Sequence, residues 1–305
     1  MSVDNNEAEE EMSRCASCGK PENDDIKLRK CTACYLVRYC GVKCQQNHKS
    51  EHEEACKERA AKLRETALLF KQPESSHLGD CPICSLPLPH DKKDSYLLYP
   101  CCSKTICAGC RFANIKRQIE GGLQQECPFC RHPAPASQVE ADRIHMKRVE
   151  ANDPVALREF GTQRYDEGDY KGAFEYWTKA AELGDVEAHY QLSCLYHNGE
   201  GVDKDEKKKV YHLEQAAIGG HPTSRHSLGC REWNNGRYKR AAKHFIVAAS
   251  LGHDDSLKKL KISYQKGRVS KDYFATTLRA HHAAVNAMKS PLREAAEADV
   301  EYVHL

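Results

Sequence analysis

The stretch that decides the fold runs from Cys81 to Arg131 and reads CPICSLPLPHDKKDSYLLYPCCSKTICAGCRFANIKRQIEGGLQQECPFCR. It contains three Cys-x-x-Cys pairs, which begin at Cys81, Cys107 and Cys127, and one adjacent pair, Cys101-Cys102. A Cys-x-x-Cys pair bends the backbone so that two thiolates face one metal ion. Two such pairs complete the tetrahedral all-sulfur shell that Zn²⁺ usually occupies. Because nothing else in the sequence indicates secretion, the spacing predicts zinc sites and not disulfides.

The order of these pairs resembles a RING finger. In that family the first and third pairs share one zinc ion, and the second and fourth pairs share another. The resemblance therefore implies two ligand sets: Cys81, Cys84, Cys107 and Cys110 for one ion, and Cys101, Cys102, Cys127 and Cys130 for the other. The family usually has a histidine ligand where this sequence has Lys104, which cannot bind a metal while it is protonated.

The adjacent cysteines leave two alternatives open for the second ion. The all-cysteine variant of the family separates these two ligands by one residue, so neighbouring thiolates on one ion imply strain. If only Cys102 binds zinc, the fourth ligand is a water molecule or a remote residue such as His90 or His132. We expect both Cys101 and Cys102 to bind, because Lys104 has removed the usual histidine.

Three residues of this stretch match positions that RING ubiquitin ligases use. Ile83 lies inside the first pair, where the family contacts the ubiquitin-conjugating enzyme, and Pro128 lies at the matching place in the last pair. Arg131 follows the last ligand, where such ligases carry an arginine that bridges ubiquitin and the conjugating enzyme. The resemblance implies a ligase that orients its reactants and supplies no nucleophile. The alternative is that Ile83 and Pro128 only stiffen loops and that Arg131 only screens thiolate charge.

A second cysteine-rich stretch, from Cys15 to Cys56, closely resembles a MYND finger. Its motifs are Cys15-x-x-Cys18, Cys31-x-x-Cys34, Cys40-x-x-x-Cys44 and His52-x-x-x-Cys56. The resemblance implies that one zinc ion is held by Cys15, Cys18, Cys40 and Cys44, and another by Cys31, Cys34, His52 and Cys56. We expect His48 at the surface, because the family's ligand is the later histidine.

MYND fingers dock short proline-containing peptides in a groove that uses a glutamine after the sixth ligand and a tryptophan four residues later. Gln45 matches the glutamine, but Lys49 stands at the tryptophan position, so the flat apolar surface on which proline stacks is missing. A purely structural finger is an equal alternative. The family also includes methyltransferases with a SET domain, but this sequence has no SET motif.

The C-terminal half repeats itself. An alanine pair followed by a glycine ends three successive units, at Ala180-Ala181-Glu182-Leu183-Gly184, Ala216-Ala217-Ile218-Gly219-Gly220 and Ala248-Ala249-Ser250-Leu251-Gly252. The pattern resembles Sel-one-like repeats, which are relatives of tetratricopeptide repeats and stack helix hairpins into a solenoid. Asp153-Pro154 is predicted to cap the first helix. A degraded fourth unit follows, and its last helix is expected to run on toward Ala298.

These modules predict a mostly α fold with two small zinc cross-brace modules, which contain short strands and helices, followed by an α-solenoid of helix hairpins. We expect this order along the chain: a disordered acidic tail at 1–12, a MYND-type finger at 13–56, a helix and linker at 57–79, a RING-type finger at 80–132, a linker helix at 133–152, the solenoid at 153–290, and a C-terminal helix or tail at 291–305.

Composition restricts the partners. The formal net charge is +2, so no strong basic field attracts nucleic acid. Four zinc ions bound to the fifteen cysteines of the two fingers would change the charge to about −5. No apolar run approaches the roughly 20 residues of a membrane span, and the metal-spaced cysteines indicate a reducing compartment, cytoplasm or nucleus. We expect about four Zn²⁺ and protein partners: a conjugating enzyme and a substrate for a ligase, or other proteins for a non-catalytic interaction scaffold.

Overall fold

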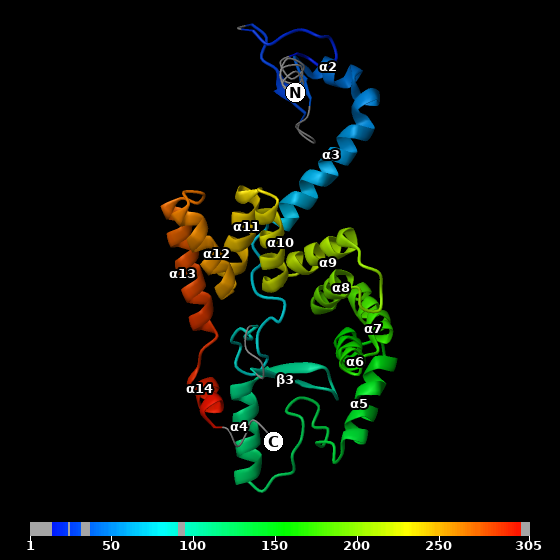
Figure 1. The fold of residues 1–305 in the computed structure, drawn as a ribbon, viewed down its shortest axis with the longest axis vertical. Coiled ribbons are helices and arrows are strands. Elements are labelled where there is room, and N and C mark those ends of the chain that lie inside the picture. Colours follow the sequence, from blue (N-terminus) through cyan, green and yellow to red (C-terminus); the bar gives the residue numbers. More distant parts are fainter. Residues whose placement is uncertain (1–13, 24, 32–36, 91–94, 300–305) are drawn as a thin grey trace. The chain divides into compact units, whose positions relative to one another are not determined.

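The computed structural model describes residues 14–23, 25–31, 37–90 and 95–299. The chain divides into two compact units, Met1–Lys71 and Gln72–Leu305 (Figure 1). The expected acidic tail at 1–12 and the expected ligand Cys34 lie outside the described residues. The described part of the chain is mostly helical, with short strands in the cysteine-rich stretches.

The first unit contains the first finger, which we define as residues 13–56. Strands β1 (Arg29–Lys30) and β2 (Arg38–Tyr39) pair antiparallel, and helices α2 (Val42–Asn47) and α3 (Lys49–Leu69) follow. A small buried cluster consists of Cys15, Cys31 and Tyr39. Helix α3 begins inside the finger and ends before Pro73, so the helix predicted after the finger is the second half of α3.

The second unit opens with the second finger, which we define as residues 80–132. Strands β3 (Tyr96–Tyr99) and β4 (Lys104–Cys107) form an antiparallel hairpin, and helix α4 (Ala108–Glu120) follows directly. Helix α4 ends at Glu120, and Gly121 is its C-cap. Helix α5 (Gln138–Glu150) then leads into the repeats.

The repeats form four helix hairpins, which we call the repeat array. Their helices are α6 (Pro154–Asp166), α7 (Tyr170–Glu182), α8 (Val186–Asn198), α9 (Glu206–Ile218), α10 (Pro222–Asn234), α11 (Tyr238–Ser250), α12 (Asp254–Gln265) and α13 (Lys271–Ala287). Glycine lets the two helices of a hairpin approach closely. A Cβ at Gly161 would lie 2.6 Å from the buried Trp177 ring, and one at Gly229 would lie 2.6 Å from Phe245. Gly161 and Gly229 therefore mark the places where the two helices of a hairpin cross.

The first helix of each hairpin is capped by the side chain of the residue before it. These capping residues are Asp153, Asp185, His221 and His253. The histidines use Nδ1 as the acceptor, for the backbone N–H of Ser224 at 3.0 Å and of Ser256 at 3.2 Å. A neutral imidazole thus takes over the cap from a carboxylate in the third and fourth hairpins.

The end of the chain differs from the expectation. A single helix running on toward Ala298 is wrong, because α13 ends at Ala287 and a separate helix α14 spans Pro291–Ala298. Ser290 caps α14 by accepting a hydrogen bond from the backbone N–H of Arg293. Pro291 lacks an N–H and cannot continue α13, so the Ser-Pro pair starts a new helix.

The second finger packs against the repeat array and α14. The backbone N–H of His77, in the linker just before the finger, donates to the carbonyl of Gly220 at 3.2 Å, and Nε2 of His90 in the finger donates to the carbonyl of Leu251 at 2.8 Å. Both acceptors lie just before a histidine cap of the array. On another side α14 packs against α4, and Figure 1 shows β3 and α4 between α5 and α14.

Among the described residues, no helix has the length and apolar character needed to cross a membrane.

The substitution Gly229→Ala tests the close crossing of α10 and α11. Helix propensity alone favours alanine over glycine by up to ~1 kcal/mol. The new Cβ would overlap the buried Phe245 ring, however, and such overpacking costs about 1–3 kcal/mol. We expect a lower midpoint of thermal unfolding by circular dichroism, with Ser227→Ala on the same helix as the control. A midpoint equal to or above that of the wild type would contradict the crossing.

Candidate metal centres

Three of the cysteine pairs lie in the same kind of tight turn, which we call a knuckle. Isolated β-bridges close the knuckles, at Arg14–Pro21, Asp80–Pro87 and Glu126–Pro133. In each, the residue after the second cysteine has a positive φ, 72° at Gly19, 55° at Ser85 and 57° at Arg131. The repeated geometry aims both sulfur atoms of a pair at one point, and this explains why Arg131 has a backbone conformation rare for a non-glycine residue.

The sulfur atoms are spaced as a zinc ion requires. A tetrahedral shell with Zn–S bonds of ~2.3 Å places sulfur atoms about 3.8 Å apart. The observed Sγ–Sγ distances are 3.7 Å for Cys18–Cys40, 3.8 Å for Cys84–Cys107 and 3.7 Å for Cys102–Cys127. The residues present therefore fit Zn²⁺.

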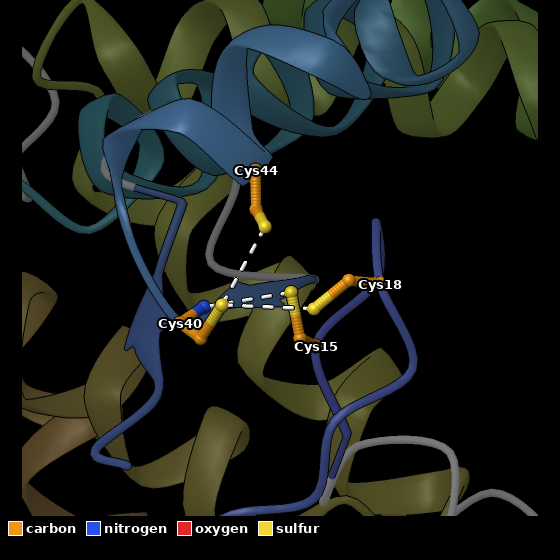
Figure 2. Close-up of side chains that lie close together, drawn as sticks. All are labelled: Cys15, Cys18, Cys40 and Cys44. Atoms are coloured by element: carbon orange, nitrogen blue, oxygen red, sulfur yellow. Dashed lines mark hydrogen bonds between the residues drawn. The ribbon is translucent and has the colours of Figure 1, made fainter.

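The first finger brings together two ligand groups. Cys15, Cys18, Cys40 and Cys44 form the 15/44 cluster, and Figure 2 shows their side chains converging from the knuckle, from the end of β2 and from α2. Cys31, His52 and Cys56 form the 31/56 cluster, with Cys31 and Cys56 sulfurs 3.7 Å apart. His48 belongs to neither group: its Nδ1 lies 3.1 Å from the phenol oxygen of Tyr39, so it is half-buried rather than at the surface.

The second finger brings together two interleaved groups. The 81/110 cluster consists of Cys81, Cys84, Cys107 and Cys110, and the 101/130 cluster consists of Cys101, Cys102, Cys127 and Cys130. Within each cluster the ligand atoms lie within 4.8 Å of one another. The first and third cysteine pairs along the chain thus form one cluster, and the second and fourth pairs form the other. This interleaving is the cross-brace that the RING resemblance implies.

A tight turn lets the adjacent cysteines reach one point. Cys101 and Cys102 lie between β3 and β4, where the backbone N–H of Ser103 donates to the carbonyl of Tyr99 and Ser103 has a φ of 54°. The sulfur of Cys101 lies 3.4 Å from that of Cys130. The turn therefore needs the left-handed conformation at Ser103, directly after the two cysteines.

The two histidines considered as substitutes have other partners. Nε2 of His90 is bonded to the carbonyl of Leu251, and its ring stacks on His253. Nδ1 of His132 lies 2.7 Å from the carbonyl of Pro133. The structure therefore favours both Cys101 and Cys102 over a remote histidine.

Thiol pKa values explain why the clusters need the metal. Burial opposes ionisation of Cys15 and Cys81, but backbone N–H groups such as those of Cys40 and Cys107 lower their pKa to about 6 and about 7. A hydrogen bond with Cys44 raises the pKa of Cys40 to about 12, and burial raises that of Cys102 to about 11. The thiols of Cys40 and Cys102 ionise only with the help of the metal's charge, so zinc binding there releases protons.

A fifth group, His77, Glu187 and His221, has the residue types of a metal site but the wrong proton arrangement. Nε2 of His77 and of His221 lie 3.1 Å and 3.0 Å from one oxygen of Glu187, beside a cavity of about 340 Å³. Nδ1 of His221 accepts the cap hydrogen bond of Ser224, so its proton is on Nε2 and points at Glu187. No lone pair remains there for a metal. The group joins the linker just before the second finger to the array by hydrogen bonds.

Comparisons with known proteins agree with two of the modules. Residues 15–56 match the MYND finger, and residues 157–185, 186–221 and 231–253 match the Sel1 repeat. The chain therefore carries a MYND finger and Sel1 repeats. Neither matching family covers residues 81–130, so the RING resemblance of the second finger rests on its cysteine geometry.

The curated relatives are matched only in part. Histone-lysine N-methyltransferase ASHR1 of Arabidopsis thaliana is 44% identical over 18% of this chain and 10% of that protein. Chitin synthase regulatory factor 4 of Schizosaccharomyces pombe is 27% identical over 28% of this chain and 14% of that protein. Mouse DAP3-binding cell death enhancer 1 is 24% identical over 46% of this chain and 35% of that protein. The chain thus spans between 10% and 35% of the length of these relatives.

Two solved structures are similar. One is a Sel1 repeat protein from Oxalobacter formigenes, 21% identical with a TM-score of 0.43 over 64% of this chain and 82% of that chain. The other is c5321, a protective antigen of uropathogenic Escherichia coli with an SLR fold, 18% identical with a TM-score of 0.39 over 63% of this chain and 40% of that chain.

Zinc stoichiometry tests the adjacent cysteines. We expect about four Zn²⁺ per chain in protein purified without chelators, and about three after either Cys101→Ser or Cys102→Ser, because each substitution removes one of four ligands. Cys194→Ser in the repeat array is the matched control and should leave the count unchanged. An unaltered count for Cys101→Ser would refute its role as a ligand.

The His253 cap predicts acid sensitivity of the array. Burial, followed by the charges of His226 and His90, lowers the pKa of His253 to about 4, below its unfolded value of ~6.5. The folded state then binds fewer protons, so the stability contribution is complete above pH ~6.5 and is lost as the pH falls toward 4. His253→Asp keeps a cap of the type that Asp185 supplies to α8. We expect its melting temperature to fall less between pH ~7.5 and ~5.

The control for this substitution is His282→Asp, which removes an exposed histidine from α13. It should leave the pH dependence of the melting temperature as in the wild type. Equal pH dependence in all three proteins would mean that His253 does not contribute to the acid sensitivity.

Proposed function

We propose that this chain is a ubiquitin ligase, or a ligase subunit, whose second finger docks a ubiquitin-conjugating enzyme. The coarser statement stands on the comparisons and the cysteine clusters: the chain binds zinc and carries repeats of a type that mediates protein–protein interaction. The Sel1 repeats would then select the protein to be modified. The reducing compartment that the free thiols require would be the cytoplasm or the nucleus.

The observation that carries the proposal is the exposure of Ile83. This side chain lies in the knuckle of the 81/110 cluster, and 47% of its surface is open to solvent. An aliphatic side chain held on a rigid, metal-braced turn is a suitable anchor for an apolar pocket of a partner. Its position is the one through which RING ligases contact the conjugating enzyme.

Pro128 and Arg131 lie in the third knuckle, which belongs to the 101/130 cluster. Pro128 is half-buried and Arg131 is exposed. The cluster would fix the direction of the Arg131 side chain, because its backbone has the left-handed conformation of the knuckle. A guanidinium in that position would bind a carbonyl or carboxylate of ubiquitin and hold the reactive thioester in one orientation.

Such a ligase contributes orientation only. The zinc ions would brace the loops that hold Ile83 and Arg131, and the chain's own residues would limit the motion of the bound conjugating enzyme. Restricting two reactants to a productive geometry accounts for a large rate increase without a catalytic acid, base or nucleophile.

Exposed tyrosines support the role of the array in partner selection. The second helix of every hairpin carries one, namely Tyr170, Tyr211, Tyr238 and Tyr273, with exposed fractions of 37%, 54%, 36% and 67%. Tyrosine is enriched in protein interfaces, since it offers apolar area together with a hydroxyl group. The contacts that the linker and the second finger make with the array fall on Glu187 and on the cap residues His221 and His253.

A non-catalytic scaffold is the second candidate. It is favoured by a groove of about 900 Å³ in the first unit, lined among others by Gln45, Lys49 and Leu63. In this case a peptide would bind along α2 and α3, and both fingers would serve only as structure. The two candidates differ in one respect: only the ligase needs Ile83.

Replacing Ile83 distinguishes the candidates. In an in-vitro autoubiquitination assay against a panel of conjugating enzymes, we expect activity from the wild type and at least a tenfold loss for Ile83→Ala, since a buried anchor is worth ~2 kcal/mol or more. Leu183→Ala in the array, with a similar exposed fraction of 51%, is the control. The zinc content of both variants should equal that of the wild type.

Arg131 is best replaced by asparagine, which tolerates the left-handed backbone that alanine would strain. Arg131→Asn should reduce ubiquitin transfer while leaving binding of the unloaded conjugating enzyme intact, because the arginine would contact ubiquitin. Wild-type activity for both Ile83→Ala and Arg131→Asn would reject the ligase docking mode and leave the scaffold.

A further inference from the structure

The buried arginine of the C-terminal helix has no role in the function proposed above. Arg293 lies in the first turn of α14, and only 5% of its surface is exposed. Its guanidinium reaches into the second finger, from which it is more than 200 residues distant in sequence.

The hydrogen bonds of Arg293 converge on the knuckle of the 81/110 cluster. Nη1 donates to the carbonyls of Pro87 at 2.7 Å and Met288 at 2.6 Å, and Nη2 donates to the carbonyl of Leu86 at 3.2 Å. Nη2 also lies 3.6 Å from the sulfur of Cys84. One side chain thus ties together the knuckle, a predicted zinc ligand and the turn that precedes α14.

The backbone of α14 lies equally close to the cluster. A Cβ at Gly109, which stands between Cys107 and Cys110, would be 2.7 Å from the backbone nitrogen of Arg293. Such an approach is open only to glycine. The local conformation does not require a glycine at position 109, because the backbone there is helical and alanine would favour the helix.

Charge explains why an arginine fills this place. Zn²⁺ with four thiolates carries a formal charge of about −2, and a buried cation is tolerated when an anion lies beside it. In the described part of the chain Arg293 makes no ion pair with a carboxylate within 4.0 Å; its anionic neighbours are the thiolates of Cys107 and Cys84. An arginine guanidinium stays protonated in proteins, so its positive charge is available to the cluster.

We propose that Arg293 is an outer partner of the zinc-bound thiolates of the 81/110 cluster, and that zinc retention at this cluster and docking of α14 depend on each other. The arginine stabilises the negative cluster, and the cluster holds the arginine and its helix in place. Coupling of this kind is reciprocal by thermodynamic necessity. The proposal rests on zinc binding and is independent of the ligase activity.

The substitution Arg293→Gln tests whether zinc retention at the 81/110 cluster depends on the arginine. Full-length protein loaded with zinc is incubated with a chelator and a thiol-alkylating reagent, and modification of each cysteine is followed by peptide mass spectrometry. We expect cysteines of the 81/110 cluster to react about 10- to 100-fold faster than in the wild type, the range typical for loss of an outer partner of a metal ligand. Arg279→Gln, at an exposed position of α13, makes the same charge change and should react like the wild type.

Gly109→Ala tests the contact without removing the arginine. Its Cβ would push the backbone of α14 away, so we expect the same selective acceleration at the 81/110 cluster. A variant that ends at Lys289 removes α14 entirely and should behave as Arg293→Gln. In all three variants the cysteines of the 15/44 cluster should keep wild-type rates.

Hydrogen exchange tests whether docking of α14 depends on zinc at the 81/110 cluster. Removal of zinc should accelerate amide exchange in residues 291–298 at least tenfold, while exchange in α7 and α8 changes much less. Unchanged cysteine reactivity in Arg293→Gln would overturn the proposal. Equal acceleration at all clusters with loss of helical circular dichroism would also overturn it, because the arginine would then support the fold as a whole and not this cluster.

Discussion

The bond between zinc and thiolate is the interaction on which both fingers depend. The buried cluster of the first finger is Cys15, Cys31 and Tyr39, and that of the second finger includes three cysteines beside Leu88 and Ile106. A module of ~50 residues cannot bury enough apolar surface to offset its conformational entropy. Metal coordination supplies the missing free energy, so the knuckles, the β3–β4 hairpin and the start of α4 are consequences of ligand placement.

In the second unit this dependence extends beyond the finger. A repeat array ordinarily holds each unit only through its neighbours in the stack. Here the second finger contacts the array through the Leu251 carbonyl and contacts α14 through Arg293, while the linker just before the finger contacts the array through the Gly220 carbonyl and Glu187. The finger therefore joins segments that are far apart along the solenoid, and its metal content affects their stability.

This arrangement suits a protein that must present one partner to another. If the second finger docks a conjugating enzyme, its fixed contacts with the first helices of the array set the distance between that enzyme and a substrate bound by the second helices. A rigid connection lowers the entropy cost of bringing the two together. The same rigidity would serve a scaffold, which is why the exposed Ile83 matters more for the assignment than the shape of the array does.

The sequence by itself determined the modules, because their signals are local. Cysteine spacing marked the metal-binding pairs, and the family resemblances implied how the ligands group. Repeated Ala-Ala steps placed the hairpins, and Asp153-Pro154 marked the first cap. The tertiary structure alone decided how α14 turns back after Ser290, that Gly109 leaves room for it, and that Cys84 and Glu187 meet partners 209 and 110 residues away. No periodicity or spacing encodes such contacts, since they form only after the stacked hairpins have brought distant segments together.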